Sequence, residues 1–149
     1  MKKIFLILAA AAMTLPCGAW GRRNHAAIAY IAEQHLTPKA YATVKEILHG
    51  ESLTYYASWV DDFRGVELLT ANINGKDTLL AKPHCFAVDK KLKPTVTPYK
   101  DAIWVIEDSM EKLGNYKDLD DSIRLDCMKN LIHLVGDIHC PAHSTYKDK

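Results

Sequence analysis

The stretch HLVGDIHCPAH, residues 133–143, places three histidines and one aspartate in an otherwise apolar segment. His133 and Asp137 are four residues apart, so on a helix their side chains lie on one face. The adjacent apolar stripe is formed by Leu131, Leu134, Val135 and Ile138. A desolvated carboxylate needs a partner, which a helix-surface ion pair or a metal ion would supply. His143, beyond a proline turn, could reach the same place and favours the metal interpretation.

Three further segments each offer one imidazole or carboxylate that is expected to face the core. His25 lies in line with Ile28 and Ala32 on a helical stripe, Asp61 is one of two adjacent acids, and His84 follows a proline outside any helix. Taken singly, each is more often a core histidine, a helix-end acid or a loop histidine. Together with the first stretch they make four segments, which is hard to obtain by chance. Histidine and aspartate without paired cysteines favour zinc, with more than one ion.

Apolar spacing and helix-boundary residues predict five helices and no persistent strand. The expected helices cover residues 25–36, 38–48, 53–64, 100–113, and from Asp120 or Asp121, either of which could cap it, to about Ile138. Thr37 is the expected cap of the second helix, with Pro38 at its first position. Residues 66–98 are less regular and contain an Asn-Gly turn signal at 74–75. The sequence therefore predicts a single all-α domain.

Residues 1–19 have the pattern of a secretory signal peptide. Two lysines precede an apolar run over residues 4–15, and small residues end the segment. The run is too short to span a bilayer as a helix. A lipidated Cys17 is an alternative that the proline directly before it disfavours. We therefore expect cleavage after Ala19, which makes Trp20 the first residue of a periplasmic or secreted chain.

The composition indicates one globular domain. The chain has 149 residues, of which 48% are hydrophobic and 25% charged. The formal net charge of +1 gives no basic footprint for duplex DNA and no membrane-surface signal, although a metal cluster could supply positive charge. Beyond the signal peptide remain Cys85, Cys127 and Cys140, an odd number that leaves at least one unpaired thiol. We expect a monomer without stable membrane association.

Four motifs in this chain occur together in one known family. They are Trp20-Gly21 with His25, the run SWVDDFR at residues 58–64, the segment around His84, and HLVGDIHxPxH at residues 133–143. With these motifs, and with fitting spacings over nearly all of residues 20–149, the chain resembles the zinc-dependent single-strand-specific nucleases and 3′-nucleotidases (the S-one/P-one nucleases). That family shares its fold with bacterial zinc phospholipase C. The resemblance implies a helical bundle of this type.

The resemblance also implies a ligand set for three zinc ions. One ion would be held by Asp61, His84, His133 and Asp137. Its close neighbour would be held by the free amine and carbonyl of Trp20, by His25 and by a shared Asp137. His143 would belong to the third ion. Asp61 and Asp137 are also the carboxylates expected to take part in catalysis.

This sequence departs from the family pattern at the third site. The family completes that site with a further His and Asp downstream, and neither occurs before Lys149. Residues 20–149 are therefore expected to be the N-terminal part of a single zinc nuclease domain. Cys140 stands where glutamine is usual, and Asn24 where glycine is usual.

The implied reaction is hydrolysis of single-stranded DNA or RNA and of 3′-nucleotides by a metal-bound hydroxide, giving 5′-phosphate products. Single-stranded nucleic acid or nucleotides are the expected substrates, with Tyr55, Tyr56 and Trp104 available for base stacking. His139 is expected to support a ligand carboxylate through a hydrogen bond. Two alternatives stay open: a phospholipase C-like zinc hydrolase, and a truncated zinc-binding domain without turnover.

Overall fold

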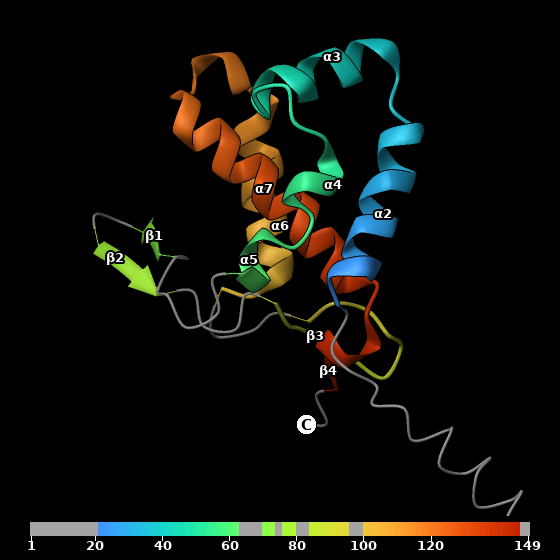
Figure 1. The fold of residues 1–149 in the computed structure, drawn as a ribbon. Coiled ribbons are helices and arrows are strands. Elements are labelled where there is room, and N and C mark those ends of the chain that lie inside the picture. Colours follow the sequence, from blue (N-terminus) through green and yellow to red (C-terminus); the bar gives the residue numbers. More distant parts are fainter. Residues whose placement is uncertain (1–20, 63–69, 74–75, 80–83, 96–99, 147–149) are drawn as a thin grey trace, which may run out of the picture.

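The computed structural model describes residues 21–62, 70–73, 76–79, 84–95 and 100–146. The helices of this part are α2 (Arg22–Gln34), α3 (Pro38–Ile47), α4 (Leu53–Tyr56), α5 (Trp59–Asp62), α6 (Ala102–Gly114) and α7 (Asp121–Ile138), with short 3-10 helices η1 (Tyr116–Asp118) and η2 (Pro141–His143). The strands are β1 (Thr70–Ile73), β2 (Lys76–Leu79), β3 (Phe86–Val88) and β4 (Ser144–Tyr146). The prediction of an all-α domain is confirmed, and short strands are added to it (Figure 1).

The helix starts follow local capping chemistry. Thr37 accepts a hydrogen bond from the Ala40 amide at 3.2 Å, with Pro38 at the first helical position, as predicted. Asp101 caps α6 by accepting from the Trp104 amide at 3.1 Å. At α7, Asp120 occupies the cap position, as one of the two predicted alternatives, but its side chain makes no capping hydrogen bond.

The third predicted helix, 53–64, is divided in two. α4 ends at Tyr56 and α5 begins at Trp59, while residues 63 and 64 lie outside the described part. At the break, the Ala57 carbonyl accepts a hydrogen bond from the ring of His133 on α7 at 2.9 Å. A side chain from another helix, His133, thus bonds a carbonyl at the point where the helix is interrupted. The spacing of residues along 53–64 does not reveal this contact.

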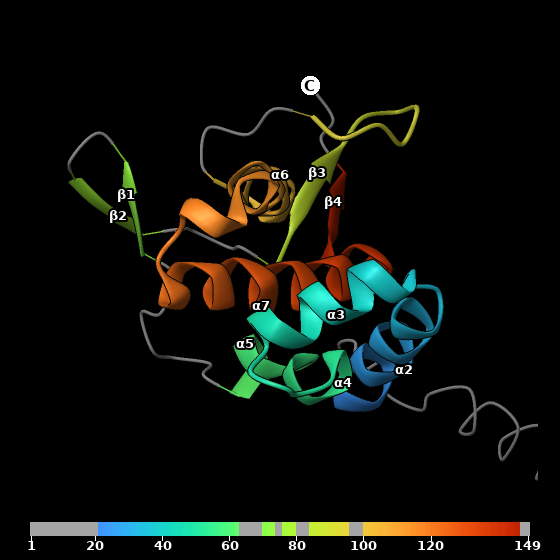
Figure 2. The same ribbon diagram turned by 90° about the horizontal axis from the view of Figure 1, so that it is seen from above.

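Helix α7 is the centre of the fold. It lies between α6 on one side and α2, α3, α4 and α5 on the other (Figure 2). One apolar cluster joins Leu134 of α7 to Ala102, Val105 and Ile106 of α6. A second cluster lies on the other side, where Ala29, Leu48, Leu53 and Ala57 pack with Leu125, Met128 and Ile132 of α7. Leu134 is fully buried, so α7 is covered by neighbours on both sides.

The strands are short additions to this bundle. β1 and β2 pair antiparallel, and the predicted Asn-Gly turn at 74–75 between them lies outside the described residues. β3 and β4 pair in parallel, with Phe86 opposite Ser144. Runs of three or four residues are too short for alternation to show in a sequence, which explains why they were not predicted.

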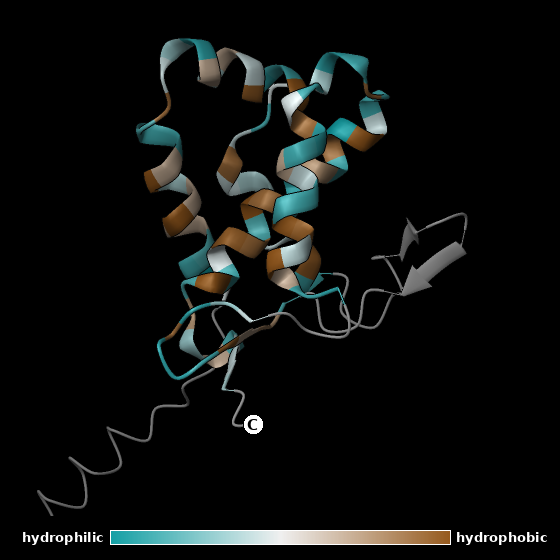
Figure 3. Cartoon of the chain, turned by 180° about the vertical axis from the view of Figure 1, so that it is seen from behind, coloured by the Kyte–Doolittle hydropathy of each residue, from teal (hydrophilic) through white to brown (hydrophobic). Residues whose placement is uncertain are grey.

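Hydrophobic and hydrophilic positions are interleaved along the helices, as expected for amphipathic helices (Figure 3). For the first helix the predicted buried stripe is partly wrong. His25 and Ala29 are buried, whereas Ala32 is exposed and Ile31 is 57% exposed. None of the described helices combines the length and the apolar character that a bilayer span requires. Cys85, Cys127 and Cys140 form no disulfide bond within the described part of the chain.

We expect the substitution Thr37→Ala to lower the free energy of unfolding by about 1 kcal/mol, because it removes the side-chain oxygen that caps α3. Thr37→Ser keeps that oxygen and should retain most of the stability. Urea denaturation followed by circular dichroism measures both variants. Equal stability of the Ala variant and the unsubstituted protein would show that the cap contributes nothing.

Candidate metal centre

The structure brings together six of the seven side chains that the sequence singled out. They come from α2 (His25), α5 (Asp61), the residue two before β3 (His84), α7 (His133 and Asp137) and η2 (His143). The seventh, Trp20, lies outside the described residues. Segments separated by more than one hundred residues therefore meet at the C-terminal end of α7.

Asp137 is the focus of this cluster. Its carboxylate is buried, and each oxygen faces two histidines. Oδ2 lies 2.9 Å from His84 Nδ1 and 3.2 Å from His133 Nε2. Oδ1 lies 3.3 Å from His25 Nε2 and 3.3 Å from His143 Nε2. One buried negative charge thus organises four imidazoles from four segments of the chain.

The surroundings keep this carboxylate ionised. Burial by itself would raise the pKa of Asp137, but contacts with His133, His25 and His84 more than offset it and hold the pKa well below its ordinary value. For His143, burial lowers the pKa below the ordinary value, although the charge of Asp137 acts in the opposite direction. An ionised carboxylate and a neutral imidazole are the forms that bind a metal ion.

The tautomer of His133 follows from its backbone contact. Nδ1 can only donate to the Ala57 carbonyl, 2.9 Å away. In the neutral ring Nε2 then carries a lone pair, and this lone pair faces Asp137 Oδ2 and His84 Nδ1, each at 3.2 Å. Two electron-rich atoms at that separation need a proton or a cation between them. A backbone carbonyl that fixes a histidine for metal binding is a common supporting contact.

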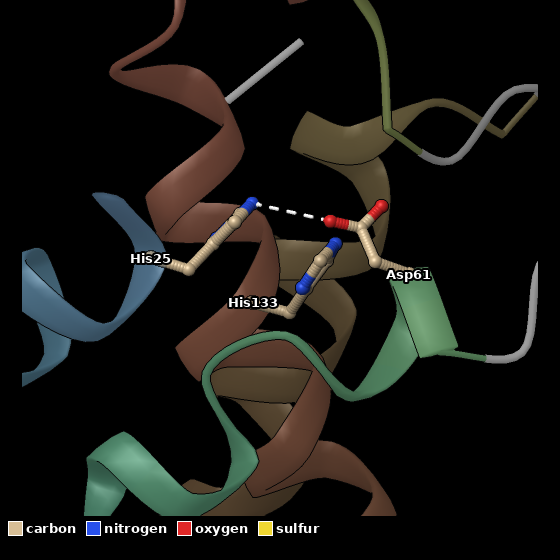
Figure 4. A group of neighbouring side chains, drawn as sticks. All are labelled: His25, Asp61 and His133. Atoms are coloured by element: carbon tan, nitrogen blue, oxygen red, sulfur yellow. Dashed lines mark ion pairs between the residues drawn. The ribbon is translucent and has the colours of Figure 1, made fainter. Parts of the chain in front are cut away.

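His25 completes one side of the cluster. Its ring stacks on that of His133, with centroids 4.4 Å apart. Its Nε2 lies 3.8 Å from Asp61 Oδ2, and the three side chains converge from three helices (Figure 4). Among the described residues neither ring nitrogen of His25 makes a hydrogen bond, although the side chain is fully buried. A buried imidazole whose nitrogens make no hydrogen bond destabilises the fold unless a bound ligand interacts with those nitrogens.

Gly136 makes room for His25. A Cβ at this position would lie 2.4 Å from His25 Nδ1, closer than side chains tolerate. The glycine is also buried and stands inside α7, where glycine costs about 1 kcal/mol relative to alanine. Sequence reasoning passed over Gly136, and the signal that could have found it is a glycine in the interior of a predicted helix.

The donor set fits zinc. Two groups of ligand atoms lie within 4.8 Å of one another: His25, Asp61 and His133 form one, and His84, His133 and Asp137 form the other. Two ligands held about 2.0 Å from one tetrahedral zinc are about 3.3 Å apart, which matches the 3.2 and 3.3 Å separations around Asp137. Nitrogen and oxygen ligands without thiolate are a usual set for zinc.

The two remaining histidines of this stretch differ in position: His143 lies in the cluster and His139 does not. His143 reaches the cluster, with its ring 12% exposed, and stacks near His84 at 5.9 Å. The expected hydrogen bond from His139 to a ligand carboxylate is wrong. His139 is exposed and donates to the Val135 carbonyl at 2.7 Å, one turn back along the same helix.

Comparisons with known proteins agree with this geometry. Nuclease S1 of Aspergillus oryzae is 26% identical over 134 residues, which cover 83% of this chain and 44% of that protein. Nuclease P1 of Penicillium citrinum is 25% identical over 135 residues, which cover 83% of this chain and 47% of that protein. The chain thus spans less than half the length of these curated relatives. The model of the S1/P1 nuclease family matches residues 20–149. Because that match takes in every residue of the cluster around Asp137, we conclude that the chain belongs to the S1/P1 nuclease family.

Proposed function

We propose that this chain forms the zinc-binding part of a nuclease that cleaves single-stranded nucleic acid and 3′-nucleotides and leaves 5′-phosphate products. The observation that carries the proposal is the buried carboxylate of Asp137 with four imidazoles around it. The family match and two relatives named as nucleases support the choice of substrate. The signal-peptide pattern of residues 1–19 supports a periplasmic or secreted location.

The ligands we propose are Trp20, His25, Asp61, His84, His133, Asp137 and His143. Zinc bound by them would lower the pKa of a coordinated water and so provide a nucleophile at neutral pH. Asp137 presents one oxygen to each pair of histidines and can be shared between two ions. The ring of His133 is held in its orientation by the hydrogen bond from Nδ1 to the Ala57 carbonyl, while the other ring nitrogen, Nε2, faces Asp137. Positive charge at the centre would then bind phosphate although the chain is close to neutral.

Two other functions would use the same ligands. A phospholipase C-like hydrolase would release phosphocholine from lecithin, and a zinc-binding domain without turnover would hold metal but cleave neither substrate. The names of the relatives favour the nuclease. Release of phosphocholine without cleavage of single-stranded DNA would favour the lipase instead.

We expect the purified protein to contain zinc and to hydrolyse single-stranded DNA and a 3′-nucleotide, and the variant Asp137→Asn to have less zinc and much lower activity. The amide is close in shape but removes the charge that faces four histidines, so zinc content should fall by at least half and hydrolysis by at least 100-fold. Metal analysis and release of acid-soluble nucleotides measure the two effects.

Asp126→Asn is the matched control, because Asp126 lies on α7 but is exposed and, among the described residues, pairs with Lys129 and not with the cluster around Asp137. It should keep zinc and activity. Zinc without hydrolysis in the unsubstituted protein would leave a metal-binding domain, and absence of zinc would overturn the proposal.

Gly136→Ala should reduce zinc content by displacing the ring of His25. Overpacking of this kind costs about 1–3 kcal/mol, which the better helix propensity of alanine only partly offsets. Gly114→Ala is the control, since a Cβ there meets nothing within 4 Å. Competition with a chromophoric chelator compares the zinc affinities of the two variants. Equal affinities would mean that His25 is not a ligand.

The proposed role of the Trp20 amine gives a separate prediction. A protein that retains one residue before Trp20 should lose one bound zinc, because the amine is then part of a peptide bond and no longer a ligand. Native mass spectrometry counts the ions on the chain that begins at Trp20 and on the extended chain. The same count for both would exclude the N-terminal amine from the site.

A further inference from the structure

A tight hairpin that follows β3 gathers positive charge. The basic hairpin, residues 89–94, carries Lys90, Lys91 and Lys93 around Leu92. All four side chains are exposed. Since the whole chain has a formal net charge of only +1, three lysines within four residues make a local concentration.

The hairpin is held in a defined shape. The Asp89 carboxylate accepts hydrogen bonds from the amides of Lys91 at 2.7 Å and Lys93 at 3.0 Å. The Asp89 amide donates to the Lys93 carbonyl at 2.9 Å, and Val88 pairs with Pro94 at the base. The one acidic group therefore stabilises the turn from within. The lysine side chains are presented on a fixed loop, which reduces the ordering cost of binding.

Leu92, in the basic hairpin, combines a left-handed backbone conformation with an exposed apolar side chain. Its φ is +58° and its side chain is 76% exposed. The left-handed conformation costs a non-glycine residue about 1–2 kcal/mol, and glycine or asparagine would relieve it. Burial does not compensate for this cost, because the side chain lies in solvent. Strain of this kind is a pointer to a role in contact with a partner.

The sheet connects the hairpin to the metal centre. β3 follows His84, and β4 follows His143 directly. The two strands are parallel and run from α7 alongside α6 toward the hairpin (Figure 2). Lys91 is the seventh residue after His84, so the two Cα atoms are at most about 25 Å apart. A strand of several nucleotides is long enough to contact the centre and the hairpin at once.

We propose that the basic hairpin binds backbone phosphates of a single-stranded nucleic acid whose reacting linkage lies at the metal centre, and that it thereby favours polynucleotides over mononucleotides. The lysines supply phosphate contacts, and Leu92 supplies apolar contact with a neighbouring base or sugar. This inference rests on the proposed function for the position of the strand.

The test is the double variant Lys91→Gln with Lys93→Gln, in the zinc-loaded protein. Binding of a fluorescent phosphorothioate-linked single strand is measured by anisotropy at several salt concentrations. The slope of log affinity against log salt should become shallower by about 1.4, since each phosphate contact of a single strand contributes about 0.7. KM for a DNA oligonucleotide should rise several-fold, while kcat and KM for a 3′-nucleotide stay unchanged. Leu92→Gly should weaken binding of the strand without changing the slope.

Lys39→Gln with Lys117→Gln is the matched control, because both lysines are exposed on other elements and the change in charge is the same. An equal effect in this control, or an unchanged slope in the hairpin variant, would overturn the proposal. So would a loss of turnover that is the same for oligonucleotide and mononucleotide. If the hairpin variant loses affinity only for phosphatidylserine vesicles, the surface is a membrane contact. Absence of cleavage by the unsubstituted protein would contradict the proposed nuclease, yet the binding slopes would still decide the role of the hairpin.

Discussion

The fold is organised around one buried negative charge. Asp137 lies at the end of the central helix α7, where burial alone would raise its pKa. Imidazoles from α7, from α2 and from the segment before β3 hold its pKa low, and the imidazole of His143 from η2 faces it as well. A buried charge without such partners costs several kcal/mol. The chain therefore has to bring these four segments together for α7 to pack between α6 and the remaining helices.

Backbone features that carry no chemistry of their own hold this arrangement. The break between α4 and α5 lets the Ala57 carbonyl orient His133. Gly136 lets the ring of His25 approach α7 more closely than any other residue would. Both features run against regular helix, one by interrupting it and the other by placing glycine inside it. Each feature lowers the local stability of a helix at a place where it positions a proposed ligand, as expected for a functional site.

The small parallel sheet of β3 and β4 connects the site to the surface of the protein. Its strands begin beside two of the histidines and end near the basic hairpin. Strand β3 thus joins the candidate metal centre to the hairpin directly along the chain. In this near-neutral protein, the arrangement would concentrate positive charge along the proposed path of a single-stranded nucleic acid without making the rest of the surface basic.

The sequence by itself determined most of the helices and the residue types that meet at the candidate site. Periodicity placed α3, α6 and α7 to within two residues, and the types and spacing of histidine and aspartate identified six side chains that the structure does bring together. Spacing could not show which histidines share one oxygen of Asp137, because that depends on contacts across more than one hundred residues. It also assigned Ala32 to the buried face and His139 to a ligand carboxylate, both wrongly. Only the packing of α2 and η2 against α7 decided which side of each segment is buried, since burial is a property of the assembled helices and not of one helix alone.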